Sequence, residues 1–254
     1  MIDVHAHFAG EGYTFPEEWE RIRAAGVSAV ILAGDTVAHS AWHKEFAESH
    51  EGAYFTAGVH PSELENLSCG WLKEIEALAR HPKCVGIGEI GLDYHYENTD
   101  KAAQKAAFVA QLELADSLSL PVQLHSRDCA ADMLSLLKEH AYLLKHGFLM
   151  HCYSHGKEMM GEFAALGAYF SFGGTVCFKN GRRVVESAAA CPEERLLTET
   201  DSPYLSPFRG EKNSPANIPV IVRRLAEVRG ADEERIKAVV RRNAETLFCK
   251  LAES

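Results

Sequence analysis

The chain has 254 residues, of which 46% are hydrophobic and 24% charged, and its formal net charge is -10. This length exceeds that of most single domains, but α/β barrels often reach it as one domain. The acidic balance argues against broad binding of duplex nucleic acid, which usually needs a basic surface, although divalent metals could still supply positive charge for an anionic substrate.

Short apolar runs alternate with longer amphipathic segments from end to end of the chain. In chain order, the runs that we expect to be strands are 1–4, 29–34, 54–60, 84–90, 121–125, 148–151, 168–172 and 196–199. Helices are expected near 16–25, 38–49, 70–81, 101–118, 129–142, 156–165, 180–190, 217–228 and 233–251. Eight strand–helix alternations without a Pro/Gly/Ser-rich linker predict an α/β protein, a single (β/α)8 barrel domain over residues 1–254. An open, doubly wound sheet is the alternative, because periodicity alone does not count strands.

Side chains that can bind metals stand at the ends of five of these runs. They are His5, His7, Glu89, His125, His151 and Asp201. His5 and His7 are two residues apart, so the alternation of a strand points both imidazoles to the same side. Any one of these residues alone is more often a hydrogen-bonded rim residue than a ligand. Since burying unpaired charge is costly, six together favour a shared metal site at one mouth of the barrel.

The number of candidate ligands exceeds what one four-coordinate zinc ion requires. Two divalent ions bridged by Glu89 fit better, with His125 and His151 on one ion and the other three side chains on the second. Mg2+, Zn2+ and Mn2+ all suit this mixture of nitrogen and oxygen donors. The expected chemistry is hydrolysis by a metal-activated water, with Glu89 as the bridge and Asp201 positioning the water and accepting its proton.

Six motifs follow one another along the chain. They are D-V-H-A-H at 3–7, G-V-H-P at 58–61, G-E-I-G-L-D-Y at 88–94, L-P-V-Q-L-H-S-R at 120–127, H-C-Y-S at 151–154 and E-T-D-S-P-Y-L at 199–205. In this order they resemble the TatD family of metal-dependent deoxyribonucleases, over essentially the whole chain. The resemblance implies a TIM barrel, a divalent-metal requirement and cleavage of DNA, which we expect at single-stranded ends, and it supports the six ligands position by position. The sequence departs from the family at Ala9, where an acidic residue is usual.

A second group of residues could contact the substrate or orient the ligands. It comprises His60, Asp93, Arg127, Ser154 and Arg209. Arginine suits phosphate because its planar fork can make two hydrogen bonds at once. Glu199 precedes Asp201 by two residues and would lie one layer deeper, as an orienting acid or as an interior residue with a basic partner. The other histidines lack a partner pattern and are expected at the surface: His39, His43, His50, His81, His95, His140, His146 and His155.

The stretch 86–91 contains a literal G-x-G-x-x-G. A dinucleotide-binding fingerprint should open a helix at once in the first βαβ unit, and this stretch lies far along the chain and continues as Leu92-Asp93-Tyr94. We therefore reject a nicotinamide cofactor. The glycines are expected to allow close packing at a strand end.

Two other functions stay open on the sequence alone. An amidohydrolase or a small-molecule phosphoesterase could use the same metals, and the loops around Ala9 and at 202–216 would decide between substrates. A metal-binding scaffold without turnover is disfavoured because no ligand is missing. The oligomeric state is left open, a monomer included.

The cellular location is expected to be the cytoplasm. The chain begins without a basic stretch before an apolar run, so we expect no signal peptide. No apolar run approaches the roughly 18 residues that a membrane span needs. The seven cysteines contain no C-x-x-C pair, which suits reduced thiols.

Overall fold

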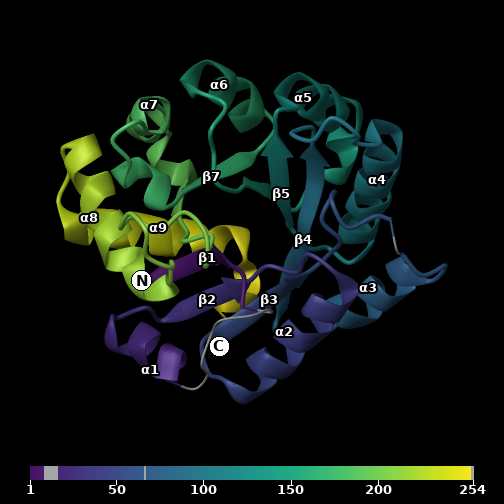
Figure 1. Ribbon diagram of the computed structural model, residues 1–254, viewed down its shortest axis with the longest axis horizontal. Coiled ribbons are helices and arrows are strands. Elements are labelled where there is room, and N and C mark those ends of the chain that lie inside the picture. The colour runs from purple at the N-terminus through teal and green to yellow at the C-terminus, as the bar shows by residue number, and fades with distance from the viewer. Residues whose placement is uncertain (9–16, 66, 253–254) are drawn as a thin grey trace.

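Eight parallel strands follow one another round the sheet in the order in which they occur along the chain (Figure 1). The structure is a computed structural model that describes residues 1–8, 17–65 and 67–252. The strands are β1 Ile2–Ala6, β2 Ala29–Leu32, β3 Ala53–Ala57, β4 Cys84–Asp93, β5 Val122–Arg127, β6 Phe148–Met150, β7 Ala168–Phe172 and β8 Leu196–Thr198. The predicted (β/α)8 barrel is confirmed, and the open sheet is wrong.

Hydrogen bonds between the segment after β8 and β1 bring the two ends of the sheet together. The Asp201 N–H donates to the His5 carbonyl at 2.9 Å, and the His7 N–H donates to the Ser202 carbonyl at 2.7 Å. These bonds fix the backbone at His5, His7 and Asp201 relative to one another. The closure of the barrel therefore also sets the spacing of three predicted ligands.

Helices connect the strands and surround the barrel (Figure 1). The α-helices are α1 Glu17–Ala24, α2 Val37–Ser49, α3 Trp71–Ala79, α4 Lys101–Ser117, α5 Ala130–Glu139, α6 Lys157–Ala165, α7 Arg182–Ala190, α8 Ile218–Arg229 and α9 Glu233–Leu247. Short 3-10 turns are η1 Ala141–Leu143, η2 Gly174–Cys177, η3 Glu193–Arg195, η4 Pro215–Asn217 and η5 Cys249–Leu251. Asp100 caps α4 by accepting from the N–H groups of Ala102 and Ala103, which would otherwise lack partners. Among the described residues, no helix is long and apolar enough to cross a membrane.

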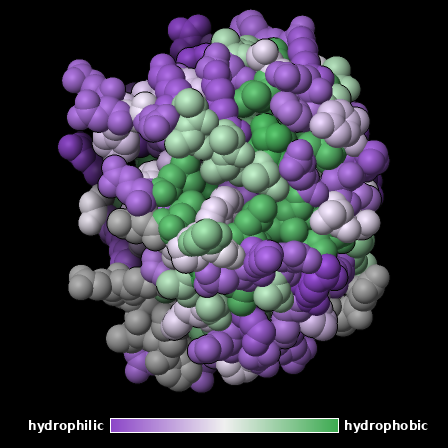
Figure 2. Space-filling view, turned by 90° about the vertical axis from the view of Figure 1, so that its right-hand side faces the viewer, coloured by the Kyte–Doolittle hydropathy of each residue, from purple (hydrophilic) through white to green (hydrophobic). Residues whose placement is uncertain are grey.

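The helix α4 is held against the mouth of the barrel by two buried glutamines. Gln104 accepts from the Asp93 N–H at 2.9 Å and donates to the Asp93 carbonyl at 3.0 Å. Gln111 makes the same pair of bonds with the backbone of Val59, at 2.8 and 3.1 Å. On this side of the molecule, which carries α3 and α4, hydrophobic residues gather in an area bordered by hydrophilic ones (Figure 2). The glutamines therefore position Val59, which precedes His60 in the loop after β3, and Asp93 at the end of β4. His60 and Asp93 both border the candidate site.

The opposite end of the barrel is closed by apolar side chains, which we call the base cluster. Its members are Ile2, Val4, Ala29, Ile31, Tyr54, Val85, Leu149, Tyr169, Leu197, Ala244, Leu247, Phe248 and Leu251. The segment after α9 lies across the start of the strands, because Lys250 Nζ donates to the carbonyl of Cys84, the first residue of β4, at 2.6 Å. Phe248 is fully buried in this cluster. The amphipathic C-terminal helix thus plugs the barrel on the side away from its mouth.

Several predicted boundaries were wrong at the mouth. Strand β4 runs on to Asp93, so Glu89 lies inside the strand rather than at its end, and the pairing with β5 shifts register between Ile87 and Ile90. Strand β3 ends at Ala57, which leaves His60 in the loop beyond it. The expected close packing of glycines is confirmed, because a Cβ on Gly91 would stand 2.0 Å from a backbone oxygen of β5. This close approach of β4 and β5 carries Glu89 towards the ligands on the neighbouring strands.

Away from the mouth, the differences concern helix ends and one histidine. The expected helix 129–142 is divided into α5 and η1, and 233–251 into α9 and η5. His43 was expected at the surface but is buried in α2 with 1% exposure. The helical pattern did not distinguish α-helix from the 3-10 turns that continue it. Ala9 lies outside the described residues.

Candidate metal centre

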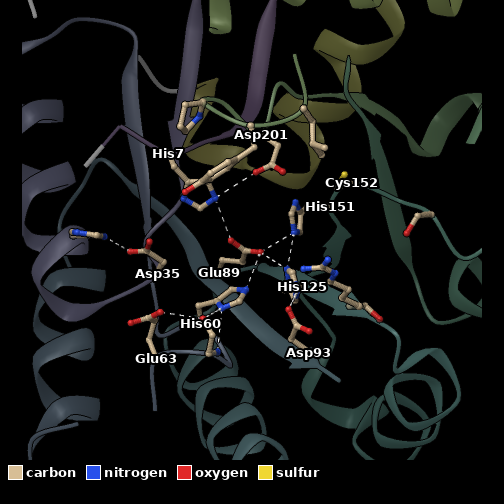
Figure 3. Close-up of a pocket in the computed structure, with 18 of the residues that line it drawn as sticks. His7, Asp35, His60, Glu63, Glu89, Asp93, His125, His151, Cys152 and Asp201 are labelled. Atoms are coloured by element: carbon tan, nitrogen blue, oxygen red, sulfur yellow. Dashed lines mark hydrogen bonds and ion pairs between the residues drawn. The ribbon is translucent and has the colours of Figure 1, made fainter. Parts of the chain in front are cut away.

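The six predicted ligands come together at the mouth of the barrel, and all except His5 are labelled in Figure 3. Five of them line one pocket, and the sixth, His5, lies fully buried beneath it. The five in the pocket are His7, Glu89, His125, His151 and Asp201. Five of the six ligands stand on a strand or directly after one. Asp201 lies three residues beyond β8, where its N–H is bonded to the His5 carbonyl of β1.

Glu89 lies between two groups of imidazoles (Figure 3). Its Oε2 is 3.4 Å from His5 Nε2 and 3.4 Å from His7 Nε2. Its Oε1 is 2.8 Å from His125 Nδ1 and 2.7 Å from His151 Nε2. The two oxygens of this one carboxylate therefore face two different sets of nitrogen donors.

Asp201 completes the group on the Oε2 side. Its Oδ1 is 3.5 Å from His7 Nε2 and 3.8 Å from His5 Nε2. Its backbone adopts a left-handed conformation with φ of 54°, which few non-glycine residues favour. This turn, together with the hydrogen bond to the His5 carbonyl, directs the carboxylate into the mouth.

The donor arrangement fits divalent cations. The Nε2 atoms of His5 and His7 are 3.1 Å apart, and His125 Nδ1 and His151 Nε2 are 3.3 Å apart. A neutral imidazole has one lone pair and one N–H, so two facing lone pairs need a proton or a cation between them. A carboxylate oxygen of Glu89 adjoins each pair. Imidazole nitrogen and carboxylate oxygen are ordinary ligands of zinc and related cations.

Two ligand imidazoles are oriented through their second nitrogen. The Gln123 amide donates to the Val4 carbonyl at 2.7 Å, so its Oε1 is left to accept from His5 Nδ1 at 3.0 Å. His5 Nε2 then carries the free lone pair that a metal requires. In the same way, His125 Nε2 donates to Asp93 Oδ2 at 3.1 Å and leaves Nδ1 facing Glu89. Such outer partners fix the orientation of ligating histidines.

The second nitrogen of His151 is a different case. Its Nδ1 is buried and has no hydrogen-bond partner among the described residues. The nearest acidic atom is Glu199 Oε1, at 3.8 Å. Glu199 itself accepts from the Cys152 N–H at 2.7 Å and from the Ser171 hydroxyl at 2.5 Å. The interior position expected for Glu199 is thus observed, but its partners are hydrogen-bond donors and not a basic residue.

The electrostatics of the mouth follow from burial and from close opposite charges. Burial alone would raise the pKa of Glu89, but the imidazoles around it, His151 first, outweigh burial and lower the pKa well below its usual value. Burial disfavours protonation of His7, yet Asp201 and Glu89 raise the pKa of His7 well above its usual value. Burial raises the pKa of Glu199 to about 7. Glu89 therefore stays ionised, and its negative charge favours cations beside it.

The residues expected to contact substrate divide into two groups. His60, Asp93, Arg127 and Ser154 line the pocket. Arg209 is exposed on the loop after β8 and is not among the described residues of the lining. Asp93 is bonded to His125 and also accepts from the His95 N–H at 2.9 Å, so the structure uses it to orient a ligand.

The tautomer of His60 can be assigned from its neighbours. The Ser62 N–H can only donate, and it lies 3.1 Å from His60 Nδ1, which must therefore accept. In the neutral ring the proton is then on Nε2, which points to the pocket and lies 3.7 Å from Glu89 Oε1. Burial lowers the pKa of His60 to about 4, so the ring is neutral near pH 7. His60 thus offers an N–H donor to whatever occupies the pocket.

Several residues of the mouth were not predicted from the sequence, and three of them matter most for the site: Gln123, Tyr96 and Tyr204. Gln123 precedes His125 by two residues, and the alternation of β5 could have placed it on the same side. Tyr96 and Tyr204 also line the pocket. Both lie beyond the ends of strands, where periodicity gives no signal.

The chain is similar to known proteins over its whole length. A family model described as TatD related DNase matches residues 2–249. The chain is 34% identical over 255 residues to the metal-dependent hydrolase YabD of Bacillus subtilis, with 98% of each chain covered. It is 37% identical over 257 residues to the 3'-5' ssDNA/RNA exonuclease TatD of Klebsiella pneumoniae, with 98% of this chain and 97% of that one covered. The crystal structure of the TatD homologue YJJV from Escherichia coli K12 superposes with a TM-score of 0.92 at 31% identity, covering 98% of this chain and 97% of that one.

Proposed function

Since this chain belongs to the TatD family of metal-dependent hydrolases, we propose that it cleaves phosphodiester bonds of DNA from single-stranded ends. The relative from Klebsiella pneumoniae, which is named a 3'-5' ssDNA/RNA exonuclease, supports a nucleic-acid substrate. The observation that carries the proposal is the position of Glu89, whose two oxygens each face a separate pair of imidazoles. This arrangement suits two divalent cations with one bridging carboxylate.

The ligand assignment follows the two sides of Glu89. His125 and His151 would hold one cation, while His5, His7 and Asp201 would hold the other. When bound, such cations lower the pKa of water and neutralise the charge of a phosphate. Mg2+, Mn2+ and Zn2+ all suit these donors.

Asp201 would accept the proton of the attacking water. Its side chain lies in the pocket and is 14% exposed, within reach of an incoming water. Burial would raise the pKa of Asp201, but its bond to His7 and the nearby imidazoles lower the pKa, so the group stays ionised and able to accept. His60 Nε2–H and the Arg127 guanidinium would donate hydrogen bonds to phosphate oxygens. Ser154 would add a hydroxyl to the same wall of the pocket, and we assign no substrate contact to Arg209.

Release of nucleotides from end-labelled DNA tests this function. Single- and double-stranded substrates are incubated with the EDTA-treated protein, and Mg2+, Mn2+ or Zn2+ is then added back. We expect no product in EDTA and restored product with at least one cation, with the single strand cleaved faster. If no cation restores product from any DNA, the nuclease assignment is wrong, and amide or small phosphoester substrates should be assayed with the same metals.

We also propose the cytoplasm as the location of this activity. All seven cysteines are free thiols, and three of them are buried. Reduced cysteines without disulfides suit a reducing compartment.

A further inference from the structure

Two exposed tyrosines stand on opposite sides of the metal pocket. Tyr204 is 61% exposed and Tyr96 is 64% exposed, and both line the pocket. Tyr204 follows β8, and Tyr96 follows β4. These two strands are four places apart in the order of eight, so they lie across the barrel from each other. Large aromatic rings at a pocket rim leave apolar area in water that a flat ligand could cover.

The backbone of each tyrosine is fixed by hydrogen bonds. The Tyr204 N–H donates to the Asp201 carbonyl at 2.9 Å, and its own carbonyl accepts from Asn213 Nδ2 at 2.7 Å. The Tyr204 ring centroid lies 6.2 Å from that of His7. The Tyr96 carbonyl accepts from the Thr99 hydroxyl at 2.7 Å. Both rings are therefore carried on anchored turns, which lowers the entropy cost of stacking a ligand on them.

The charges of the pocket exclude the usual way of holding a nucleic-acid strand. Among the described lining residues, Arg127 is the one lysine or arginine. The acidic lining residues are Asp35, Glu63, Glu89, Asp93 and Asp201. Binding along a phosphate backbone depends on several lysines and arginines. His60, Arg127 and the cations could hold the scissile phosphate, but the lining offers few cationic side chains for further phosphates. We therefore expect recognition of another part of the nucleotide.

We propose that Tyr204 and Tyr96 are stacking platforms for the bases on the two sides of the scissile phosphate. The proposal rests on the proposed nuclease function and explains a preference for single strands. Stacking of bases on aromatic side chains is tolerant of sequence, because every base has a flat face. In a duplex, both faces of every internal base are covered by neighbouring base pairs, and pairing holds the bases on the two sides of a phosphate stacked on each other. Only unpaired nucleotides can therefore place their bases on these rings.

The test measures cleavage of two single-stranded oligonucleotides that differ in their ends. One has normal terminal nucleotides, and the other is abasic at the last two positions. The variants are Tyr204→Ala, Tyr204→Phe, Tyr96→Ala and Tyr96→Phe. Tyr142→Ala is the matched control, because Tyr142 is also largely exposed, at 60%, but is not part of the described lining.

The expected results separate stacking from a general loss of activity. The wild type should cleave the abasic substrate with a kcat/KM roughly 5- to 100-fold lower than that of the normal one, as one or two lost stacking contacts predict. Each alanine variant should lose activity on the normal substrate and lose part of this discrimination. The phenylalanine variants keep the ring and should therefore keep the discrimination between the two substrates. Tyr142→Ala should behave as the wild type.

Three results would overturn the inference, and the third differs from the first two because it also removes the nuclease function. If the wild type cleaves DNA but treats the normal and abasic ends equally, the bases are not recognised, and the nuclease function stands without the platforms. The same conclusion follows if Tyr204→Ala and Tyr96→Ala keep the full discrimination of the wild type. If no DNA is cleaved with any added cation, both the function and the platforms are wrong.

Discussion

The two ends of this barrel are built from the same strands but differ in almost every physical property. On β6, Leu149 belongs to the base cluster, and His151, two residues later, faces the metal pocket. On β8, Leu197 belongs to the base cluster and Glu199 follows by the same spacing. Side chains two residues apart in a strand point to the same face of the sheet. The interior of the barrel therefore changes from apolar to ionisable within two residues along each of these strands. The base can stabilise the fold through burial, whereas the mouth is arranged for chemistry.

The buried acidic groups near the mouth lower the stability of the folded chain. Asp3 and Glu199 are fully buried carboxyls, and burial raises the pKa of each to about 7. A carboxyl whose pKa is raised disfavours the folded state once it ionises. Substitutions of the candidate ligands at the mouth should therefore affect mainly catalysis, and substitutions at the base should affect mainly the free energy of unfolding.

The largest effect is expected for Asp201→Asn at the mouth. The amide keeps the shape of the side chain but cannot accept a proton from water. Loss of a general base typically lowers kcat by about 100- to 10,000-fold. Steady-state cleavage of single-stranded DNA with saturating cation measures this, and a denaturation curve run in parallel should match that of the wild type. Cleavage within a few fold of the wild type would refute the role of Asp201.

The second largest effect, on the free energy of unfolding, is expected for Phe248→Ala in the base cluster. Phe248 is fully buried, and removal of such a ring leaves a cavity that costs about 3–5 kcal/mol of unfolding free energy. Urea unfolding measures this loss, and kcat per folded molecule should not change. Phe208→Ala is the matched control, because Phe208 is 43% exposed and its substitution should shift stability by about 0.5 kcal/mol or less. If Phe248→Ala alters kcat instead, the two ends are not independent.

This contrast also explains what sequence analysis could and could not predict. The strands and their apolar residues at the base could be predicted because apolar periodicity is a local property of the sequence. The candidate ligands were proposed because a polar residue at or just after the end of an apolar run, such as His151 or Asp201, breaks that periodicity at a fixed place. Burial without a partner is costly, so such breaks are informative.

The features that were not predicted depend on contacts between strands and loops that are far apart in the sequence. The register shift in β4 moved the strand end from the predicted Ile90 to Asp93, so Glu89 lies mid-strand. The platform residues Tyr96 and Tyr204 lie on irregular turns, and their common pocket arises only because β4 and β8 face each other across the closed barrel. Which residues face each other across the barrel is a property of the tertiary structure, which a local sequence pattern does not contain.

A pH-dependent difference is expected for Glu199→Gln. The pKa of Glu199 is about 7 in the folded chain and near 4.5 ordinarily, so between these values the folded state binds more protons than the unfolded state. Stability from this group is therefore present below pH 4.5 and lost as pH rises through 7, in total about 3 kcal/mol. The unfolding free energy of the wild type relative to Glu199→Gln should fall over this interval in EDTA. Glu139→Gln, an exposed position, should follow the wild type, and a difference that is constant with pH would contradict the buried-acid interpretation.

The smallest effect is expected for Asp93→Asn, because Asp93 would act on the cation through its hydrogen bond to His125. A neutral amide still accepts from His125 Nε2 but no longer makes the imidazole more basic, so cation affinity should fall by roughly 10- to 100-fold. Competition with a chelator of known affinity measures the change. Asp128→Asn removes the same kind of charge from the exposed His95, whose Nδ1 lies 3.0 Å from Asp128 Oδ2, and should leave affinity unchanged. Equal losses in both variants would mean that overall charge controls cation binding, and that the orientation of His125 by Asp93 does not.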